Sequence, residues 1–288
     1  MKKTKSVSLE EGYIFALQFV KKHYENFPVI SLFLKKELRK HTAVIYQFAR
    51  QADDIADEGN LSDKARLLKL NEYENQLTKA LADDVDEIFW MALINTIKQK
   101  NLSTDNFYDL LRAFKQDISK NRYKDYDELL DYCKFSANPV GRIILELNGI
   151  NNYEAYYHSN QICTALQITN FLQDVSVDIE KGRIYLPLEE MKNFYVEEED
   201  LRKKKFNVQF KKLMEFQVNR TRQLFIEGRK ILKFLPFRLK LQIITTIKGG
   251  EEILNLIEEN NYNVLDARPK LKKSDVIKLF KDTVLKGS

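Results

Sequence analysis

Apolar residues recur at helical spacing along most of the chain, and residues that break helices are rare. In the segment 8–24, for example, Ile14, Leu17 and Val20 repeat every third residue on one helical face. The 288 residues include only nine Gly and five Pro, too few for the many tight turns of a strand-rich fold. The pattern predicts an all-α, mostly antiparallel bundle that forms a single domain over residues 1–288.

Breakers and caps set the expected helix boundaries. Pro28 ends the first helix, Ser62 opens a helix with an acidic first turn, and Pro139 suits the first turn of another. Besides the helix that begins at Ser62, the expected segments are 8–24, 29–40, 41–58, 84–100, 104–119, 125–136, 139–148, 152–180, 188–193, 196–204, 208–230, 236–259 and 273–285.

Charge and composition exclude several classes of protein. The 47 basic and 42 acidic residues give a net charge of +5 and a mixed surface, which argues against a nucleic-acid partner. The two cysteines, Cys133 and Cys163, have no metal-site spacing and fit a reducing compartment. The basic N-terminus lacks the apolar core of a secretory signal, and no apolar run is long enough to span a bilayer. We therefore expect a cytoplasmic protein.

The first candidate site is an acidic stripe on the helix expected at 41–58. Asp53 and Asp57 are four residues apart, so both project from one face, about 6 Å apart along the axis. Arg50 and Tyr46 continue the same stripe. Carboxylates this close repel each other, and Mg²⁺, which prefers carboxylate and phosphate oxygens, would offset the repulsion. A solvated helix end, or pairing of the carboxylates with Arg50 and lysines, explains the stripe equally well.

A second polar stripe lies on the segment 152–180. Asn170, Asp174 and Asp178 follow i, i+4, i+8 within an otherwise apolar helix, where unpartnered acceptors are costly. Arg183 follows, and a guanidinium can bind phosphate through two hydrogen bonds, although it can also act as a partner for the helix dipole. If the two stripes face each other, they would hold several Mg²⁺ ions and a diphosphate substrate.

These motifs resemble those of the squalene/phytoene synthases. The family has Tyr-x-x-x-Arg before Asp-x-x-x-Asp, and Asn-x-x-x-Asp-x-x-x-Asp before Arg-x-Tyr; both patterns are complete here. The resemblance covers most of residues 10–270 and implies an isoprenoid-synthase bundle with a central active-site cavity. It implies Mg²⁺ ligands at Asp53, Asp57, Asn170, Asp174 and Asp178, catalytic roles for these aspartates and Tyr185, and substrate contacts at Tyr46, Arg50, Gln167 and Arg183.

Two shorter segments, 23–29 and 136–142, look like the bacterial hydroxysqualene synthase branch. That branch converts presqualene diphosphate into hydroxysqualene in squalene or hopanoid biosynthesis, and water captures the rearranged cation. The resemblance implies two companion enzymes, a presqualene diphosphate synthase and a flavin-dependent reductase, and no nicotinamide cofactor. Since the metal ligands are all oxygens, either Mg²⁺ or Mn²⁺ should support activity.

The resemblance also implies a lining for the hydrocarbon part of the substrate. It assigns Phe27, Tyr132, Ala137 and Gly141 to the pocket and places Arg268 near the diphosphate. A core position explains Phe27 equally well, and close helix packing explains Ala137 and Gly141 equally well. The Lys-rich segment 270–286 has an amphipathic pattern, which fits either peripheral contact with an anionic membrane or a final packed helix.

Two alternatives stay open at this point. One is a squalene, dehydrosqualene or phytoene synthase that uses farnesyl or geranylgeranyl diphosphate. The depth of the channel decides the length of the prenyl chain, and one sequence does not reveal that depth. The other, from a different class, is a catalytically silent family member that acts as an assembly factor; such a protein is expected to lose metal ligands, and none is missing here.

Overall fold

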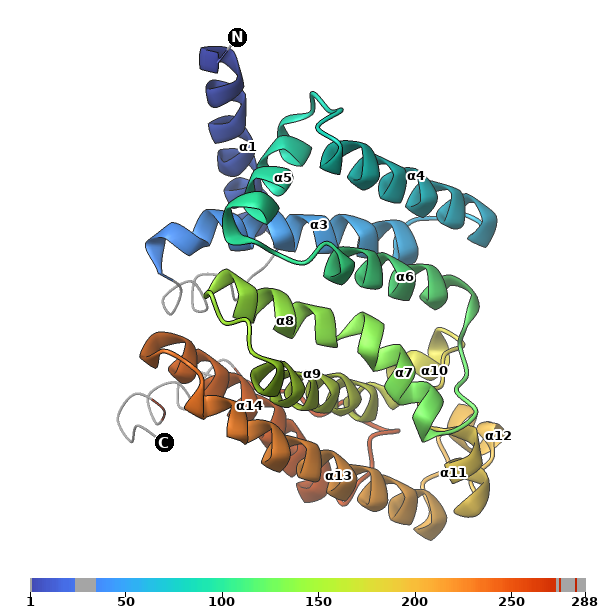
Figure 1. The fold of residues 1–288 in the computed structure, drawn as a ribbon. Helices are drawn as coiled ribbons and strands as arrows, with labels where there is room; N and C mark the ends of the chain where they lie inside the picture. Colours follow the sequence, from blue (N-terminus) through green and yellow to red (C-terminus); the bar gives the residue numbers. More distant parts are fainter. Residues whose placement is uncertain (1, 24–34, 273–274, 276–282, 284–288) are drawn as a thin grey trace. The chain divides into compact units, whose positions relative to one another are not determined.

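The computed structural model describes residues 2–23, 35–272, 275 and 283. Helices and the turns between them make up these residues, and no strand occurs among them, which confirms the all-α prediction (Figure 1). Within this described part, no helix is both long and apolar enough to cross a membrane.

The chain forms two compact units, and each takes two segments of the sequence. Unit 1 comprises residues 1–119 and 143–151, and unit 2 comprises residues 120–142 and 152–288. The boundary between residues 142 and 143 falls inside one helix, α8 (Asn138–Leu147). The single domain that the sequence predicts is not tested by this division and stays a prediction.

Unit 1 is built from helices whose apolar faces share one core. In chain order they are α1 (Lys2–His23), the 3₁₀ turn η1 (Lys36–Leu38), α3 (Arg39–Asp57), α4 (Asp63–Leu81), α5 (Ile88–Lys100) and α6 (Asp105–Ser119). Ser62 caps α4 by accepting a hydrogen bond from the Ala65 amide, as the sequence predicts. Asn101, in the left-handed conformation, ends α5.

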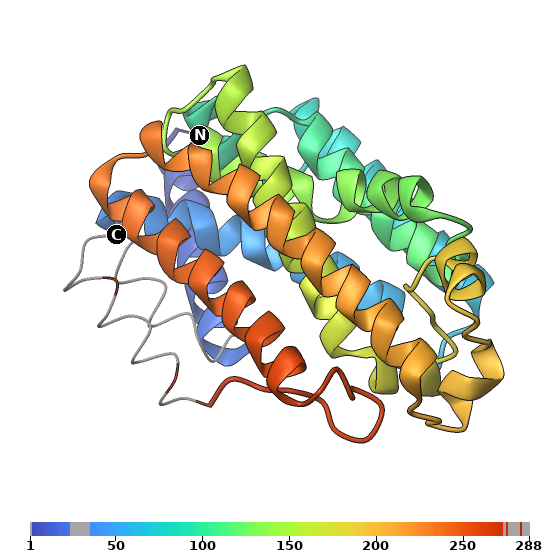
Figure 2. The ribbon, with the colours of Figure 1, turned by 90° about the horizontal axis from the view of Figure 1, so that it is seen from below.

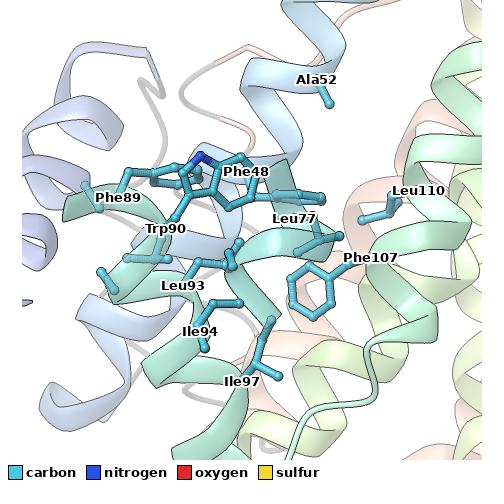
Figure 3. Close-up of a cluster of buried hydrophobic side chains, with 14 of the residues drawn as sticks. Phe48, Ala52, Leu77, Phe89, Trp90, Leu93, Ile94, Ile97, Phe107 and Leu110 are labelled. Carbon is cyan, nitrogen blue, oxygen red and sulfur yellow. The ribbon is translucent and has the colours of Figure 1, made fainter. Parts of the chain in front are cut away.

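Aromatic rings fill the centre of this core. Phe48 of α3 is completely buried, and its ring packs 5.4 Å from Tyr73, 6.3 Å from Trp90 and 5.3 Å from Phe107, measured between ring centroids. Figure 3 shows these contributions from α3, α5 and α6, with Leu77 of α4 among them. The core therefore buries the face of α3 that lies opposite to the one carrying Asp53 and Asp57.

Unit 2 contains the remaining helices. They are α7 (Tyr126–Ser136), the first part of α8, α9 (Tyr153–Gln173), α10 (Val175–Glu180), α11 (Leu188–Asn193), α12 (Glu198–Arg202), α13 (Val208–Gly228), the 3₁₀ turn η2 (Arg229–Lys233) and α14 (Phe237–Glu259). Asp125, Asn152 and Asn207 cap α7, α9 and α13 by accepting hydrogen bonds from backbone amides three residues ahead.

Helix α9 is the centre of unit 2, and α7, α13 and α14 all pack against it. Figure 2 shows α13 and α14 lying side by side. Small residues allow the closest approaches: a Cβ on Gly228 of α13 would lie 2.5 Å from Ile162 and 3.2 Å from the His158 carbonyl oxygen, both on α9. This packing buries the apolar side of α9 and determines which of its residues remain accessible.

Four expected segments differ from the structure or lie outside its described part. Helix α1 begins at Lys2 rather than near residue 8, because the lysine-rich start contains no breaker. The expected helix 152–180 is interrupted at Asp174, where backbone angles of φ −101° and ψ 8° separate α9 from α10. The expected segment 29–40 lies partly outside the described residues, and 273–285 lies almost entirely outside them.

Candidate functional site

The first acidic motif occupies the last turns of α3. The Arg50 Nη1 atom lies 3.3 Å from Asp53 Oδ2, so the stripe of Arg50 and Asp53 that the sequence predicts is present. The Tyr46 hydroxyl donates to the His23 carbonyl oxygen at 3.4 Å, and burial raises the pKa of this phenol. Asp57 is the last residue of the helix and is exposed.

Arg50 binds more carboxylates than the sequence suggests. Its Nε atom lies 2.6 Å from Asp54 Oδ1, and its Nη2 atom contacts Glu58. Glu58 is eight residues from Arg50, beyond helical spacing, and reaches it because α3 ends at Asp57. Burial, together with Asp57, Asp54 and Glu58, raises the pKa of Asp53 against the opposing effect of Arg50. Further positive charge at this end of α3 would therefore be stabilising.

The end of α3 is held in place by a residue that the sequence analysis missed. Arg66 of α4 donates from Nη1 to the carbonyl oxygens of Ile55 and Glu58, both at 3.0 Å, and from Nη2 to Gly59 at 2.7 Å. Ile55 belongs to the last turn of α3, and Glu58 and Gly59 directly follow its end, so the guanidinium caps the helix end. The position of Asp57 is thereby fixed from outside its own helix.

The second acidic motif lies where α9 gives way to α10. Asn170 is exposed on the last turn of α9, whereas Asp174 and Asp178 are partly buried. The backbone bonds Asp174 N–H to Asn170 O (2.9 Å) and Asp178 N–H to Asp174 O (2.8 Å) persist across the bend. The i, i+4, i+8 order of the motif is therefore kept even though the helix is interrupted.

Arg268 binds the central aspartate of this motif. Its Nη2 atom donates to Asp174 Oδ2 at 3.0 Å, and its Nε atom donates to Oδ1, which gives a bidentate pair. The neighbours of this pair are also joined, because Gln173 Nε2 donates to the Pro269 carbonyl oxygen at 2.5 Å. The sequence predicted Arg268 beside the diphosphate; the structure places it against one of the predicted metal ligands.

Asp178 is the most perturbed acid of the motif. Burial and the nearby Asp174 carboxylate raise its pKa from the usual 3.8 to about 6, against the opposing charges of Lys181, Arg183 and Arg268. Asp178 also shares a small cavity with Arg183 and Tyr185, so these three predicted residues lie together. A cation that binds Asp178 would therefore stabilise the ionised form of this carboxylate.

This raised pKa predicts how stability depends on pH. The folded-state pKa of Asp178 exceeds its unfolded value, so the ionised carboxylate destabilises the fold above pH 6, and protonation relieves this between pH 6 and pH 4. In the presence of a chelator, Asp178→Asn should raise the Tm at pH 8 by about 2–4 °C, which corresponds to about 1 kcal/mol in a chain of this size. The gain should shrink to nothing near pH 4 in thermal scans.

The matched control is Asp131→Asn, which replaces an exposed carboxylate of α7 in the same unit. This variant should show no gain in Tm at pH 8. An increase for Asp178→Asn that is equal at pH 8 and pH 4.5 would contradict the explanation.

An aromatic group stands beside the second motif. The Tyr185 ring stacks on Phe171 of α9, with centroids 3.8 Å apart and planes 3° from parallel. Tyr123 and Tyr132 complete the group, with centroids 5.6 Å and 6.2 Å from that of Tyr185. Tyr123 was not predicted, because it lies in a loop without periodicity; its aromatic character was the only available signal. The group offers π faces that can stabilise positive charge.

The stacked pair should be measurable in a double-mutant cycle. Phe171→Leu and Tyr185→Leu each remove one ring but keep an apolar side chain. We expect the unfolding free energies of the two single variants and the double variant to give a coupling of about 1 kcal/mol, as for other aromatic pairs. Urea denaturation of the four proteins provides the measurement, and additive effects would show that the stacking contributes nothing.

The predicted hydrocarbon-pocket residues at the junction of α7 and α8 are buried. Tyr132 is 4% exposed and Ala137 is 7% exposed. A Cβ on Gly141 would lie 2.4 Å from Ser159 Oγ and 2.6 Å from Cys163 Sγ, so the close approach of α8 to α9 requires glycine there. Helix packing thus accounts for Gly141. A role for these three residues in substrate binding stays a prediction.

Of the two remaining predicted residues, only one lies in the described part of the chain. Gln167 is half-buried on α9, one turn before Asn170. Phe27 lies outside the described residues.

Among the residues that the structure describes, no three His, Cys, Asp or Glu side chains converge into a group able to hold a metal ion. The two acidic motifs belong to different units, so the complete metal site also stays a prediction.

The helical architecture and the two motifs agree with the comparisons to known proteins, which identify the class of fold. The structure resembles the crystal structure of squalene synthase HpnC from Alicyclobacillus acidocaldarius with a TM-score of 0.85 and 35% identity, covering 89% of this chain and 97% of that chain. The squalene/phytoene synthase family model matches residues 20–275. The chain therefore belongs to the squalene/phytoene synthase family, a family of isoprenoid-forming enzymes.

Relatives of two activities are similar to this chain. A hydroxysqualene synthase of Zymomonas mobilis is 38% identical over 164 residues, which is 57% of this chain but only about half (54%) of that protein's length. A 15-cis-phytoene synthase of Synechocystis is 28% identical over 273 residues, covering 91% of this chain and 81% of the relative. These similarities establish the family but not the particular reaction.

Proposed function

We propose that this protein converts presqualene diphosphate into hydroxysqualene in a Mg²⁺-dependent reaction. The observation that carries the proposal is the complete pair of acidic motifs, each with an arginine bound to its first aspartate: Arg50 to Asp53 and Arg268 to Asp174. Identity to a hydroxysqualene synthase and to squalene synthase HpnC supports the branch.

The residues present suit Mg²⁺. Asp53, Asp57, Asn170, Asp174 and Asp178 offer oxygen donors only, as Mg²⁺ and Mn²⁺ prefer. The raised pKa values of Asp53 and Asp178 indicate carboxylates whose charge is not fully compensated by the protein. Several bound ions would supply Lewis-acid stabilisation of the departing diphosphate.

The protein's own groups can assist at both ends of the substrate. Arg50, Arg183 and Arg268 are placed beside the acidic motifs and can bind phosphate oxygens once a metal takes over the carboxylates. The stacked rings of Tyr185 and Phe171 present π faces to a carbocation. The carbon–oxygen bond to diphosphate breaks, water adds to the rearranged carbon, and a proton is released, so no reductant or nicotinamide is consumed.

The test is a product assay with purified protein. With presqualene diphosphate and Mg²⁺ but no NADPH, hydroxysqualene should form; excess chelator should abolish it, and Mn²⁺ should restore it. Failure to form hydroxysqualene, together with consumption of farnesyl or geranylgeranyl diphosphate alone, would instead indicate a squalene, dehydrosqualene or phytoene synthase. Inertness towards all three substrates would favour the assembly-factor alternative.

The cellular setting follows from the same proposal. A presqualene diphosphate synthase must supply the substrate, and a flavin-dependent reductase would consume the alcohol. Because both substrate and product are lipids, we propose that the protein works in the cytoplasm with peripheral contact at the inner membrane face. Flotation with anionic vesicles would test that contact.

A further inference from the structure

Unit 1 contains a pocket of about 520 Å³ that is lined by none of the residues assigned to the proposed reaction. Its apolar lining consists of Phe15 of α1, Tyr73 of α4, and Ile88, Phe89 and Trp90 of α5. Three amides, Gln47, Gln51 and Gln76, complete much of the rest. The volume falls within the range of about 300–1,000 Å³ that small-molecule sites occupy.

Gln47 is the unusual member of this lining. Its side chain is completely buried, yet neither its Oε1 nor its Nε2 atom has a hydrogen-bond partner among the described residues. A buried amide without partners is unfavourable, because folding removes its bonds to water and provides none in return. Such an exception in a well-packed core calls for a partner from outside the chain.

A neighbouring amide of the lining, in contrast, has a hydrogen-bond partner. Gln51, one turn further along α3, accepts a hydrogen bond from the Tyr73 hydroxyl at 3.2 Å. The same hydroxyl lies 3.3 Å from the Phe48 carbonyl oxygen. Tyr73 is therefore engaged by Gln51 and the backbone, and it satisfies neither the donor nor the acceptor of Gln47.

Two carboxylates of the lining determine which ligand charge the pocket favours. Asp86 and Glu87 line it and are exposed, and no ion pair or side-chain hydrogen bond involves either of them in the described part of the chain. Their negative charge repels anions, including the diphosphates of the proposed reaction, and favours neutral or cationic groups. Charge and position together separate this pocket from the candidate active site.

We propose that this pocket binds a small organic molecule with an aromatic or similar apolar body and an amide-like head group. The head group would donate to Gln47 Oε1, as an amide or an amidinium can, and an amide would also accept from Nε2. The Gln47 side chain, covered in the free protein, would turn toward it. The apolar body would lie against Phe15, Phe89 and Trp90. The proposal is independent of the reaction that the acidic motifs carry out.

Three probes of equal shape test this proposal: neutral benzamide, cationic benzamidine and anionic benzoate. Trp90 is the only tryptophan of the chain and lines the pocket, so its fluorescence reports binding directly. Benzamide and benzamidine should give saturable changes, and benzoate should give none. Absence of a saturable signal from both benzamide and benzamidine would overturn the proposal.

Variants locate the binding. Gln47→Leu should weaken benzamide binding about tenfold, the loss of roughly one good hydrogen bond. It should also raise the Tm of the free protein, because the unpartnered amide is gone. Gln242→Leu, the same substitution at a buried amide oxygen of unit 2, is the matched control and should leave benzamide binding unchanged. Equal affinity of Gln47→Leu and the parent protein would refute the assignment.

Two further variants keep the test decisive if Gln47→Leu folds poorly. Phe15 is 46% exposed, so Phe15→Ala should preserve the fold while weakening benzamide and benzamidine alike. A combined Asp86→Asn and Glu87→Gln change should reduce the preference for benzamidine over benzamide about threefold, as expected for exposed charges. Unchanged binding in both variants would show that the probes bind elsewhere.

Discussion

In the proposed reaction, Asp53→Asn should lower kcat for presqualene diphosphate by about 100- to 1,000-fold, the range seen when one group that stabilises the departing charge is removed. The asparagine oxygen can still approach a metal ion, but it carries no charge, and Arg50 would lose one of its three carboxylate partners. Because the pKa of Asp53 is already raised by burial, its neutral replacement should not destabilise the fold. Steady-state turnover and thermal unfolding, measured together, separate the two effects.

The matched control for this variant is Asp84→Asn. Asp84 is exposed in the loop before α5 and belongs to neither acidic motif, and the change should leave both turnover and Tm unaltered. Turnover by Asp53→Asn equal to that of the parent protein would argue against the metal site.

Phe48→Ala should lower the free energy of unfolding by about 3–5 kcal/mol, as other large-to-small changes of buried aromatics do. Phe48 is completely buried and packs against Tyr73, Trp90 and Phe107, so the cavity left behind would remove contacts with three helices. Against a total stability of about 5–15 kcal/mol, this loss would leave unit 1 marginal.

Urea denaturation followed by far-ultraviolet circular dichroism provides the measurement for Phe48→Ala. Phe237→Ala is the matched control, because Phe237 is 73% exposed, and it should change stability by less than about 0.5 kcal/mol. Similar losses for the two variants would show that burial does not explain the effect.

Most of the helices were predictable because their boundaries depend on local chemistry. Ser62 caps the helix that the sequence predicts it to open, and Asp125 and Asn152 cap helices that begin within one residue of the expected starts. The start of α1 and the bend at Asp174 were not predicted. A period of 3.6 residues continues through a one-residue bend whose hydrogen bonds are largely kept, so the pattern alone gives no signal there.

Within the candidate site, spacing along one helix was informative and contacts between distant segments were not. The pairing of Arg50 with Asp53 follows from their positions on α3. The pair of Arg268 and Asp174 joins residues 94 positions apart, and no periodicity connects them. The addition of Tyr123 to Tyr185 and Phe171 likewise depends on a loop that only the folded unit positions.

The assignment of residues 143–151 to unit 1 has a consequence for synthesis on the ribosome. Ile143 and Leu147 belong to the core of unit 1, and Glu146 accepts hydrogen bonds from the Ser103 amide and from Asn106. A nascent chain that has reached residue 119 therefore still lacks part of its first core. At about 5–20 residues per second, synthesis of residues 120–147 takes about 1.4–5.6 s, and α7 is made before α8 can complete the core of unit 1. The N-terminal unit is completed only after the second has begun.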